Sequence, residues 1–465
     1  MNELSREAIE AVLEKGRMYE VGGTVRDRLL AGSPASADRD FLVTGIGYDE
    51  LSRLLRQFGQ VNLVGRSFGV IKYTEYRDGA PVTFDISLPR TEHSTGVGHK
   101  DFEVRYDPAL AIEDDLVRRD FTINAMAIAL GSDEIIDPLG GQEDLRKRLV
   151  RMVYPESFTD DPLRMLRAVG FAARFEFDIE ERTFAAIAAK APLIRTVSAE
   201  RIAEELRKLL ERAARPSRGL QLMERSGLLA EVLPELQACV GVAQPGGFHA
   251  YDVFEHTLRT IDACPRGLAV RLAALFHDIN KPQAKREVIR EGQPGATFYG
   301  HEMLGAATAR SVLRRLRFAH DLIRQVTTLV ERHMFTTDVT DKGLRRLVRR
   351  VGVPLIFDLL DLRRADVTAQ GMGGRTDDVD EFEARIRAEL DRKPPFSLND
   401  LALDGGDVMR ILKVAPGPLI GRVLDYLLEQ VLDDPELNQP ETLADLAREF
   451  YEATKESPND KESDL

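Results

Sequence analysis

Two aspartates, Asp38 and Asp40, stand two residues apart at the start of a predicted strand. Side chains alternate along a strand, so both carboxylates are expected on one face. Gly22 and Gly23 precede them, between another predicted strand and a predicted helix. Glycines let backbone N–H groups approach phosphate oxygens, a helix N-terminus favours negative charge, and paired carboxylates suit Mg²⁺. Residues 18–44 therefore predict a platform for a triphosphate and Mg²⁺.

A third carboxylate comes from the predicted strand over 82–87, on which Asp85 faces away from the apolar side chains. It is a candidate neighbour of the aspartate pair, although a solvent-facing strand residue is an equally simple interpretation. The next segment, 88–104, is polar, contains glycine and has no periodicity. We expect a mobile loop beside the site.

The segment 111–130 predicts a helix beginning near Leu116, with buried apolar positions. Four polar side chains fall within it: Arg118, Arg119, Asp120 and Asn124. Polar groups pressed against a core need partners. The phosphates and ribose of a nucleotide would supply them, and an internal salt-bridge network is the alternative.

A further helix is predicted over 157–175, with Thr159 or Asp160 as N-cap. Asp161 and Arg164 are three apart and would share a face at its start. A carboxylate accepts from an exocyclic amine and a guanidinium donates to ring acceptors, so this pair could read the edge of a base. The alternative is an intrahelical ion pair with a capping role.

A second group of residues could bind a metal ion. His256 lies on one predicted helix, the doublet His277-Asp278 ends another, and Asp366 follows on a third. Histidine and aspartate on separate helices are suitable metal ligands. Five of the eight histidines fall in this part of the chain: His249, His256, His277, His301 and His333.

The composition is that of a globular chain of more than one domain, with 465 residues of which 43% are hydrophobic. From about residue 153 nearly every segment predicts a helix. The two isolated cysteines, Cys239 and Cys264, indicate a reducing compartment. The N-terminal segment predicts an amphipathic helix without signal-peptide character, and no run of about 18 apolar residues predicts a membrane span. The cytoplasm is the expected location.

The net charge of −13 taken alone argues against a nucleic-acid partner, because phosphate contacts need lysine and arginine. Three segments are nevertheless basic: 144–151, 309–317 and 342–350. Solvated helix faces explain any one of them, and together they permit a nucleic-acid surface.

The motifs VGGTVRD, DRD, RRDFTINAMA, DPLGG and DDPLRMLRAVGFAARF occur in one order along the chain. In that order they resemble the class II tRNA nucleotidyltransferases and bacterial poly(A) polymerases, and FEH…FHDINKP…ADVTAQG resembles the HD domain attached to many of the tRNA enzymes. The resemblance covers about residues 18–432. It implies an α+β fold, with a nucleotidyltransferase head followed by helical regions. The expected divisions are a head over 1–140, a helical neck and body over 141–240, an HD domain over 241–390, a helical tail over 391–455 and a disordered terminus over 456–465.

The resemblance also implies roles. Asp38, Asp40 and Asp85 would be catalytic, with two Mg²⁺ ions on Asp38 and Asp40. The implied nucleotide-binding residues are Gly22, Gly23, Arg26, Asp27, Arg119, Asp120, Asn124, Asp160, Asp161, Arg164 and Arg167. Asp161 and Arg164 would form a protein template for CTP and ATP. The implied HD site is His256, His277, Asp278 and Asp366, with a divalent metal and phosphohydrolase activity. A degenerate, purely structural HD domain is the alternative.

This sequence departs from the family pattern at two positions. Asp160 stands where the family usually has Glu and is one methylene shorter, which alters its support of Arg164. Asn280 replaces the Gly that often follows the HD ligand pair, and because asparagine tolerates left-handed geometry, we expect the turn to persist.

The implied activity is addition of CCA to the tRNA 3′ end from CTP and ATP, with release of pyrophosphate. Addition of A only, of CC only, or of a poly(A) tail are alternatives within the class. The long segment 88–104 argues against CC-only addition, and the HD domain and acidic chain argue against poly(A) synthesis. A different class of interpretation is an HD phosphohydrolase whose head only binds RNA or nucleotide.

Overall fold

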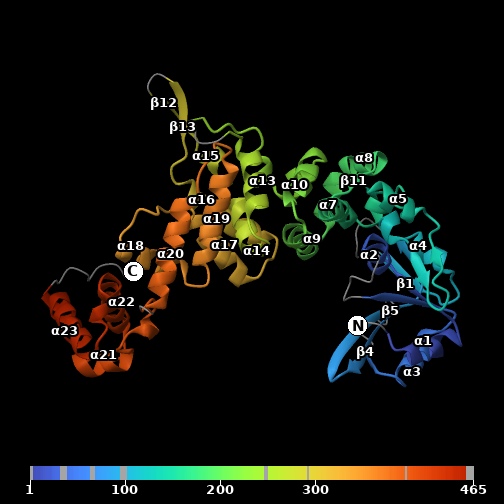
Figure 1. The fold of residues 1–465 in the computed structure, drawn as a ribbon, viewed down its shortest axis with the longest axis horizontal. Helices are drawn as coiled ribbons and strands as arrows, with labels where there is room; N and C mark the ends of the chain where they lie inside the picture. The colour runs from blue at the N-terminus through green and yellow to red at the C-terminus, as the bar shows by residue number, and fades with distance from the viewer. Residues whose placement is uncertain are drawn as a thin grey trace. The chain divides into compact units, whose positions relative to one another are not determined.

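The chain forms two compact units (Figure 1). The first comprises residues 1–238 with 312–318, and the second comprises 239–311 with 319–465. The computed structural model describes residues 4–31, 39–62, 69–94, 102–245, 250–290, 293–392 and 395–456. The first unit opens with a mixed sheet and continues in helices, and the second is mostly helical, as the α+β prediction requires.

The sheet-containing head of the first unit extends to residue 150. Its elements are α1 (Arg6–Leu13), β1 (Arg17–Val21), α2 (Gly23–Ala31), β2 (Asp40–Thr44), α3 (Tyr48–Leu55), β3 (Gln60–Asn62), β4 (Val70–Arg77), β5 (Ala80–Ser87), β6 (Arg90–Ser94), β7 (Phe102–Tyr106), α4 (Ile112–Leu116), η2 (Thr122–Asn124), β8 (Ala127–Ala129), β9 (Ile135–Ile136), α5 (Gly141–Lys147) and β10 (Leu149–Val150). The helical part that follows consists of α6 (Ser157–Asp160), α7 (Leu163–Phe175), the short β11 (Asp178–Ile179), α8 (Glu181–Lys190), η3 (Ala191–Thr196), α9 (Ala199–Arg212), α10 (Pro216–Arg225), α11 (Leu228–Val232) and α12 (Pro234–Gln237).

Seven strands form the main sheet, in the order β3-β4-β5-β2-β1-β8-β9. Alternation along the central strands sends side chains to two apolar layers. Phe41 and Val43 pack with α1 and α3 on one face, whereas Leu42 packs with α4 on the other. Asp40 lies two residues before Leu42 on β2, so its carboxylate points to the same face of the sheet, the face that α4 covers.

The parallel pairing of β2 with β5 sets the positions of two acidic residues. Asp40 is the register partner of Asp85, and the pairing continues through Phe41 with Ile86. Register partners in a sheet point to the same face, so a one-residue slip would separate these carboxylates. The expected proximity of Asp85 to the Asp40 strand is confirmed. Asp38 and the predicted loop before it lie outside the described residues.

The predicted helix beginning near Leu116 is wrong, because α4 ends at that residue. Beyond it the chain makes a turn, the short 3₁₀ helix η2 and strand β8. The cause is local competition from polar side chains. The buried Asp115 binds two arginines, and Asp120 accepts the N–H of Phe121 at 2.8 Å, so the helical ladder is not continued.

The predicted helix over 157–175 is two helices, α6 and α7, and Asp160 ends the first instead of capping the second. Pro162 disfavours helical geometry at the residue before it. Asp161 accordingly has φ −134° and ψ 96°, between the two helices. Asp161 and Arg164 therefore do not share a helix face.

Two further segments differ from expectation. The predicted loop over 88–104 has strands at both ends, since β6 and β7 pair as an antiparallel hairpin, and residues 95–101 lie outside the described residues. In the second unit, β12 and β13 form a hairpin within a region predicted as helical.

The second unit contains α13 (Val253–Ala263), α14 (Leu268–Phe276), α15 (Lys281–Ala284), β12 (Arg286–Arg290), β13 (Gln293–Thr297), α16 (His301–Arg315, whose last turn belongs to the first unit), α17 (His320–Arg332), α18 (Asp341–Val351), α19 (Ile356–Ala369), α20 (Asp377–Asp391), η4 (Leu398–Asp400), α21 (Gly405–Leu412), α22 (Pro418–Asp433), η5 (Pro435–Leu437) and α23 (Pro440–Glu456). Helices α13, α14, α17 and α19 pack together, and α21, α22 and α23 enclose a separate apolar core. Cys239 and Cys264 are both buried. In the described part of the chain, no helix has the length and apolarity to cross a membrane.

The basic segment 342–350 is largely neutralised within the second unit. Arg346 and Arg349 of α18 pair with Glu429 of α22, and Arg345 pairs with the buried Glu389. These arginines join helices to one another through ion pairs. Such a structural role is the alternative to a nucleic-acid surface.

Candidate functional site

A cleft of about 620 Å³ opens in the first unit, on the side of the sheet that carries Asp40. Ten basic and five acidic side chains line it. The basic ones are Arg26, Arg90, Arg118, Arg119, Arg164, Arg167, Arg174, Arg201, Lys208 and Arg212. Such an excess of positive charge in a concave site favours a polyanion such as a nucleoside triphosphate or an RNA end.

The turn between β1 and α2 brings backbone to this cleft. Gly22 has φ +72°, in the left-handed region that favours glycine. A Cβ atom at this position would lie 2.7 Å from Nη1 of Arg119, so the guanidinium lies directly over the glycine. Gly22 and Gly23 both line the cleft, as predicted from the turn sequence.

Asp40 and Asp85 present neighbouring carboxylates on the sheet side of the cleft. The Nζ atom of Lys72, the register partner of Asp85 on β4, lies 3.0 Å from Oδ1 of Asp85. Carboxylate oxygens in a hydrated cleft are the donors that Mg²⁺ prefers, so the residues present fit that ion. A cation at Asp85 would compete with Lys72.

Asp115 holds Arg118 and Arg119 in place. Its side chain is completely buried, and it accepts from Arg118 Nε at 2.9 Å and from Arg119 Nη2 at 3.1 Å. A single buried carboxylate thus orients two guanidinium groups, and the local charge remains positive. Sequence reasoning singled out Arg119 and did not identify Asp115 as the group that positions it.

Asp120 organises a second network. It accepts from Arg167 Nε and Nη2 at 2.9 and 2.7 Å through Oδ2, and from Asn124 Nδ2 at 3.0 Å through Oδ1. Burial alone would raise the pKa of Asp120, but Arg167, Asn124 and Arg164 outweigh it and hold that pKa below its ordinary value. Asp120 is therefore ionised near neutral pH.

Arg26 links that network to the glycine turn. Its Nη1 donates to Asn124 Oδ1 at 2.6 Å, its Nε donates to Asp27, and its guanidinium lies over the rings of Phe171 and Phe175. The predicted nucleotide-binding residues 26, 27, 120, 124 and 167 are therefore joined to one another by hydrogen bonds and ion pairs. They form the internal salt-bridge network that was the alternative interpretation, and all of them except Asp27 also line the cleft.

Arg164 is 9% exposed and enters the cleft from α7. Its Nη1 donates to the Tyr154 hydroxyl at 3.1 Å and to Ser157 Oγ at 2.9 Å, and its Nη2 donates to the Arg118 carbonyl at 2.9 Å. The Tyr154 hydroxyl in turn donates to Asp160 Oδ2 at 2.8 Å.

Asp161 has a different partner from the one that sequence spacing indicated. Its Oδ2 accepts from Arg201 Nη2 of α9 at 2.8 Å, and its Oδ1 accepts from the Leu163 N–H at 3.2 Å. Asp161 and Arg164 thus both line the cleft, each held by its own contacts. Sequence reasoning missed Tyr154, Ser157 and Arg201, because no short-range pattern marks residues up to 40 positions away.

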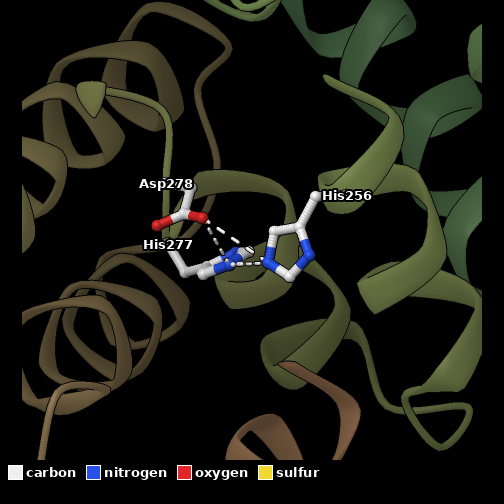
Figure 2. A group of neighbouring side chains, drawn as sticks. All are labelled: His256, His277 and Asp278. Atoms are coloured by element: carbon white, nitrogen blue, oxygen red, sulfur yellow. Dashed lines mark hydrogen bonds and ion pairs between the residues drawn. The ribbon is translucent and has the colours of Figure 1, made fainter. Parts of the chain in front are cut away.

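A separate cluster lies in the second unit (Figure 2), where His256, His277 and Asp278 converge. The Nε2 atoms of the two histidines lie 3.2 Å apart, and Asp278 Oδ2 lies 3.2 Å from His277 Nε2. Asp366 Oδ1 lies 3.1 Å from His256 Nε2. The four predicted residues of this site therefore meet from α13, the end of α14 and α19.

Two more histidines join the cluster. Asp278 Oδ1 lies 3.3 Å from His301 Nε2, which in turn lies 3.2 Å from His333 Nε2. Burial and the neighbouring His277 lower the pKa of His333 to about 3, so this imidazole is neutral and able to ligate. The two carboxylate oxygens of Asp278 thus face two histidine pairs. His249, the fifth histidine of this region, lies outside the described residues.

Neighbouring carboxylates beside a glycine turn, in a strongly cationic cleft on a mixed sheet, define a nucleotidyltransferase site. Sequence comparisons agree. The family description "Poly A polymerase head domain" matches residues 18–151, "Probable RNA and SrmB- binding site of polymerase A" matches 176–239, and "tRNA nucleotidyltransferase domain 2 putative" matches 300–447.

The relatives are similar over most of the chain. An A-adding tRNA nucleotidyltransferase of Deinococcus radiodurans is 36% identical over 68% of this chain and 75% of its own length. A multifunctional CCA protein of Burkholderia pseudomallei is 34% identical over 81% of this chain and 87% of its own. The fold resembles that of a Bacillus stearothermophilus CCA-adding enzyme solved with CTP, with a TM-score of 0.69, 24% identity and coverage of 97% of each chain. The chain belongs to the family of tRNA nucleotidyltransferases and bacterial poly(A) polymerases.

Proposed function

We propose that this enzyme adds C, C and A in turn to the 3′ end of tRNA, using CTP and ATP and releasing pyrophosphate. The observation that carries the proposal is the single cleft in which the Asp40–Asp85 carboxylate pair, the arginines over the glycine turn and the groups around Arg164 meet. Relatives named multifunctional CCA proteins, 33–38% identical, support it.

Different residues of the cleft have different roles in this reaction. Gly22 and Arg119 bind phosphate oxygens, and Arg26 supports them through its contacts with Asn124 and two rings. Asp161 accepts from the exocyclic amine of cytosine or adenine, and Arg164 donates to a ring acceptor. Two Mg²⁺ ions, held by Asp38 and Asp40 with Asp85 beside them, would lower the pKa of the attacking 3′-hydroxyl and neutralise developing charge on the leaving group.

The test uses tRNA transcripts ending before CCA, after C and after CC, each incubated with CTP or ATP alone and with both. CCA addition requires CTP incorporation on the first two ends and ATP incorporation on the third. Asp40→Ala should lower every incorporation by a factor on the order of 10³, because a metal ligand at the reacting centre is lost. Exposed Asp49→Ala on α3 is the matched control.

Addition of A alone is the second candidate, favoured by the 36% identity to the A-adding enzyme of D. radiodurans. It predicts ATP incorporation on CC ends and no CTP incorporation on any end. The same transcripts therefore decide between the two.

The six-residue cluster of the second unit favours an additional activity, hydrolysis of phosphate esters or cyclic phosphates at an HD-type metal site. Four imidazoles and the carboxylates of Asp278 and Asp366 provide a donor set for borderline divalent cations such as Mn²⁺, Ni²⁺ or Zn²⁺. His277→Ala should abolish hydrolysis of p-nitrophenyl phosphate and 2′,3′-cyclic AMP with each metal and leave nucleotide incorporation intact. Hydrolysis that persists in this variant would contradict the assignment.

A further inference from the structure

The Tyr154 hydroxyl lies between the Asp160 carboxylate and the Arg164 guanidinium. In the described part of the chain, no direct hydrogen bond or ion pair joins the Asp160 carboxylate to the Arg164 guanidinium. The two charged groups contact the same hydroxyl instead, at 2.8 and 3.1 Å. Asp160 ends α6, Arg164 lies in the first turn of α7, and Tyr154 precedes both helices.

The chemistry of the three groups fixes the direction of the hydrogen bonds. A guanidinium only donates, and an ionised carboxylate only accepts. The hydroxyl must therefore accept from Arg164 and give its proton to Asp160. Burial raises the pKa of Tyr154 to about 12, so the hydroxyl keeps this proton at neutral pH. A chain of this kind polarises the hydroxyl and strengthens its hold on the arginine.

Other contacts show how tightly the guanidinium is oriented. Ser157 Oγ takes the second hydrogen of Nη1, and the Arg118 carbonyl takes one hydrogen of Nη2. The guanidinium also lies 5.8 Å from the centre of the Tyr154 ring. Tyr154 thus contacts Arg164 by its ring and its hydroxyl, whereas Asp160 acts on Arg164 through that hydroxyl.

We propose that Tyr154 is a positioning residue for nucleotide choice. Its hydroxyl connects the short Asp160 side chain to the Arg164 guanidinium, and so fixes the orientation in which that guanidinium faces the base. The proposal rests on the proposed function, in which Arg164 reads the base. It explains how aspartate can stand at position 160, since the hydroxyl spans the distance that a longer carboxylate side chain would cover. Tyr154 itself is not among the residues that line the cleft.

The test compares Tyr154→Phe with the wild type. Phenylalanine keeps the ring beneath the guanidinium and removes only the hydroxyl. We expect the preference for ATP and CTP over GTP and UTP to fall about tenfold, the scale of one charge-assisted hydrogen bond. The change should appear in the KM for ATP and CTP, with kcat nearly unchanged. Tyr76→Phe, which removes an exposed hydroxyl from β4 of the same unit, is the matched control.

A second substitution tests the connection to Asp160. In the Tyr154→Phe background, Asp160→Glu should recover most of the lost preference, because the longer side chain can approach Arg164 directly. Asp160→Ala should cause the same loss as Tyr154→Phe, and combining the two should add nothing further. If Tyr154→Phe does not fold, Asp160→Ala still tests the hydrogen-bonded connection, from the side of Asp160.

Unchanged nucleotide preference in both Tyr154→Phe and Asp160→Ala would overturn the proposal. So would additive losses, or a loss that Asp160→Glu fails to recover, since each would separate the hydroxyl from Asp160. Failure of the proposed function is visible separately, as absence of ATP and CTP incorporation by the wild type. Direct binding of ATP and CTP to the wild type and variants still reports on Tyr154 in that case.

Discussion

At the scale of single residues, the cleft depends on two buried carboxylates that orient its arginines. Asp115 is fully buried beneath Arg118 and Arg119, and Asp120 is 8% exposed beneath Arg167 and Asn124. Each is satisfied by several donors, which is the condition under which a buried charge is tolerated. Fixed guanidinium groups need little reorganisation when a polyanion arrives.

Substitution of Asp115 by asparagine should therefore weaken nucleotide binding. Asparagine keeps one acceptor oxygen and replaces the other with a donor, so it cannot hold both Arg118 and Arg119. We expect the KM for ATP to rise about tenfold with a smaller effect on kcat. Steady-state kinetics at saturating tRNA measure this. Asp114→Asn is the control, because the Asp114 carboxylate caps the exposed N–H of Ala111. Equal effects of the two substitutions would contradict the anchoring role.

The lowered pKa of Asp120 predicts that the stability of the fold depends on pH. Its pKa is lowered in the folded protein, so its charge stabilises the fold above the unfolded-chain pKa of about 4 and ceases to do so as the pH falls through the lower folded value. The free energy of unfolding of the wild type should exceed that of Asp120→Asn by roughly 3 kcal/mol at pH 7. Chemical denaturation between pH 2 and pH 7 should show this difference shrinking below about pH 4. Glu143→Gln, at a partly exposed ion pair on α5, should change the free energy of unfolding little at any pH in this range.

At the scale of elements, the site is built where strand ends and a tight turn meet. The parallel register of β2 and β5 sets the carboxylate pair, and the β1–α2 turn lays its backbone beneath Arg119. Helices α7 and α9 add Arg164 and Arg201 from the helical side. Strands, a turn and helices all contribute side chains, so the geometry of the cleft depends on the turn as much as on the strands.

Gly22→Ala separates backbone strain from the loss of this contact. Alanine at φ +72° is strained, and its Cβ would also displace the Arg119 guanidinium. We expect a stability loss of about 1 kcal/mol and a much larger loss of nucleotide incorporation. Gly79→Ala is a matched control, since Gly79 has φ +78° but no heavy atom within 4 Å of the added Cβ. It should lose similar stability and keep its activity, and comparable loss of incorporation in both would argue against the role of Gly22.

At the scale of the whole molecule, a chain of net charge −13 still carries a strongly basic cleft. The charge is segregated. Basic side chains of the first unit line the cleft, while those of α18 in the second unit are paired with acidic residues of α22. Local charge, and not the total, decides whether RNA can bind.

Loss of two cations that line the cleft should weaken tRNA binding more than loss of two cations of α18, although Lys208 of the cleft also pairs with Glu205 at 2.9 Å. Lys208→Ala with Arg212→Ala should lower tRNA affinity and reduce the slope of log affinity against log salt by about 2. Arg346→Ala with Arg349→Ala removes the same charge from α18 and should leave that slope unchanged while lowering thermal stability. Filter binding at several salt concentrations measures both, and identical slopes would contradict the prediction.

Short-range patterns predicted the strand–turn–helix at Gly22, the side-chain alternation from Asp40 along β2 and the helices that carry His256 and Asp366. Such features depend on periodicity and turn chemistry within a few residues. The segment after Leu116 could not be predicted in the same way, because its side chains take the hydrogen bonds of the helix that hydrophobic periodicity favours. Partners distant in sequence, such as Arg201 for Asp161 and His333 for His301, depend on tertiary packing alone.

The burial of both cysteines has a practical consequence for spectroscopy. Cys239 and Cys264 are enclosed, and burial raises the pKa of each thiol to about 12, so neither offers a thiolate to an alkylating dye at neutral pH. A cysteine introduced at an exposed position, such as Asp321→Cys on α17, would then be the one reactive thiol of the folded chain. Maleimide fluorophores or spin labels can be attached there in the native background, without first replacing either natural cysteine.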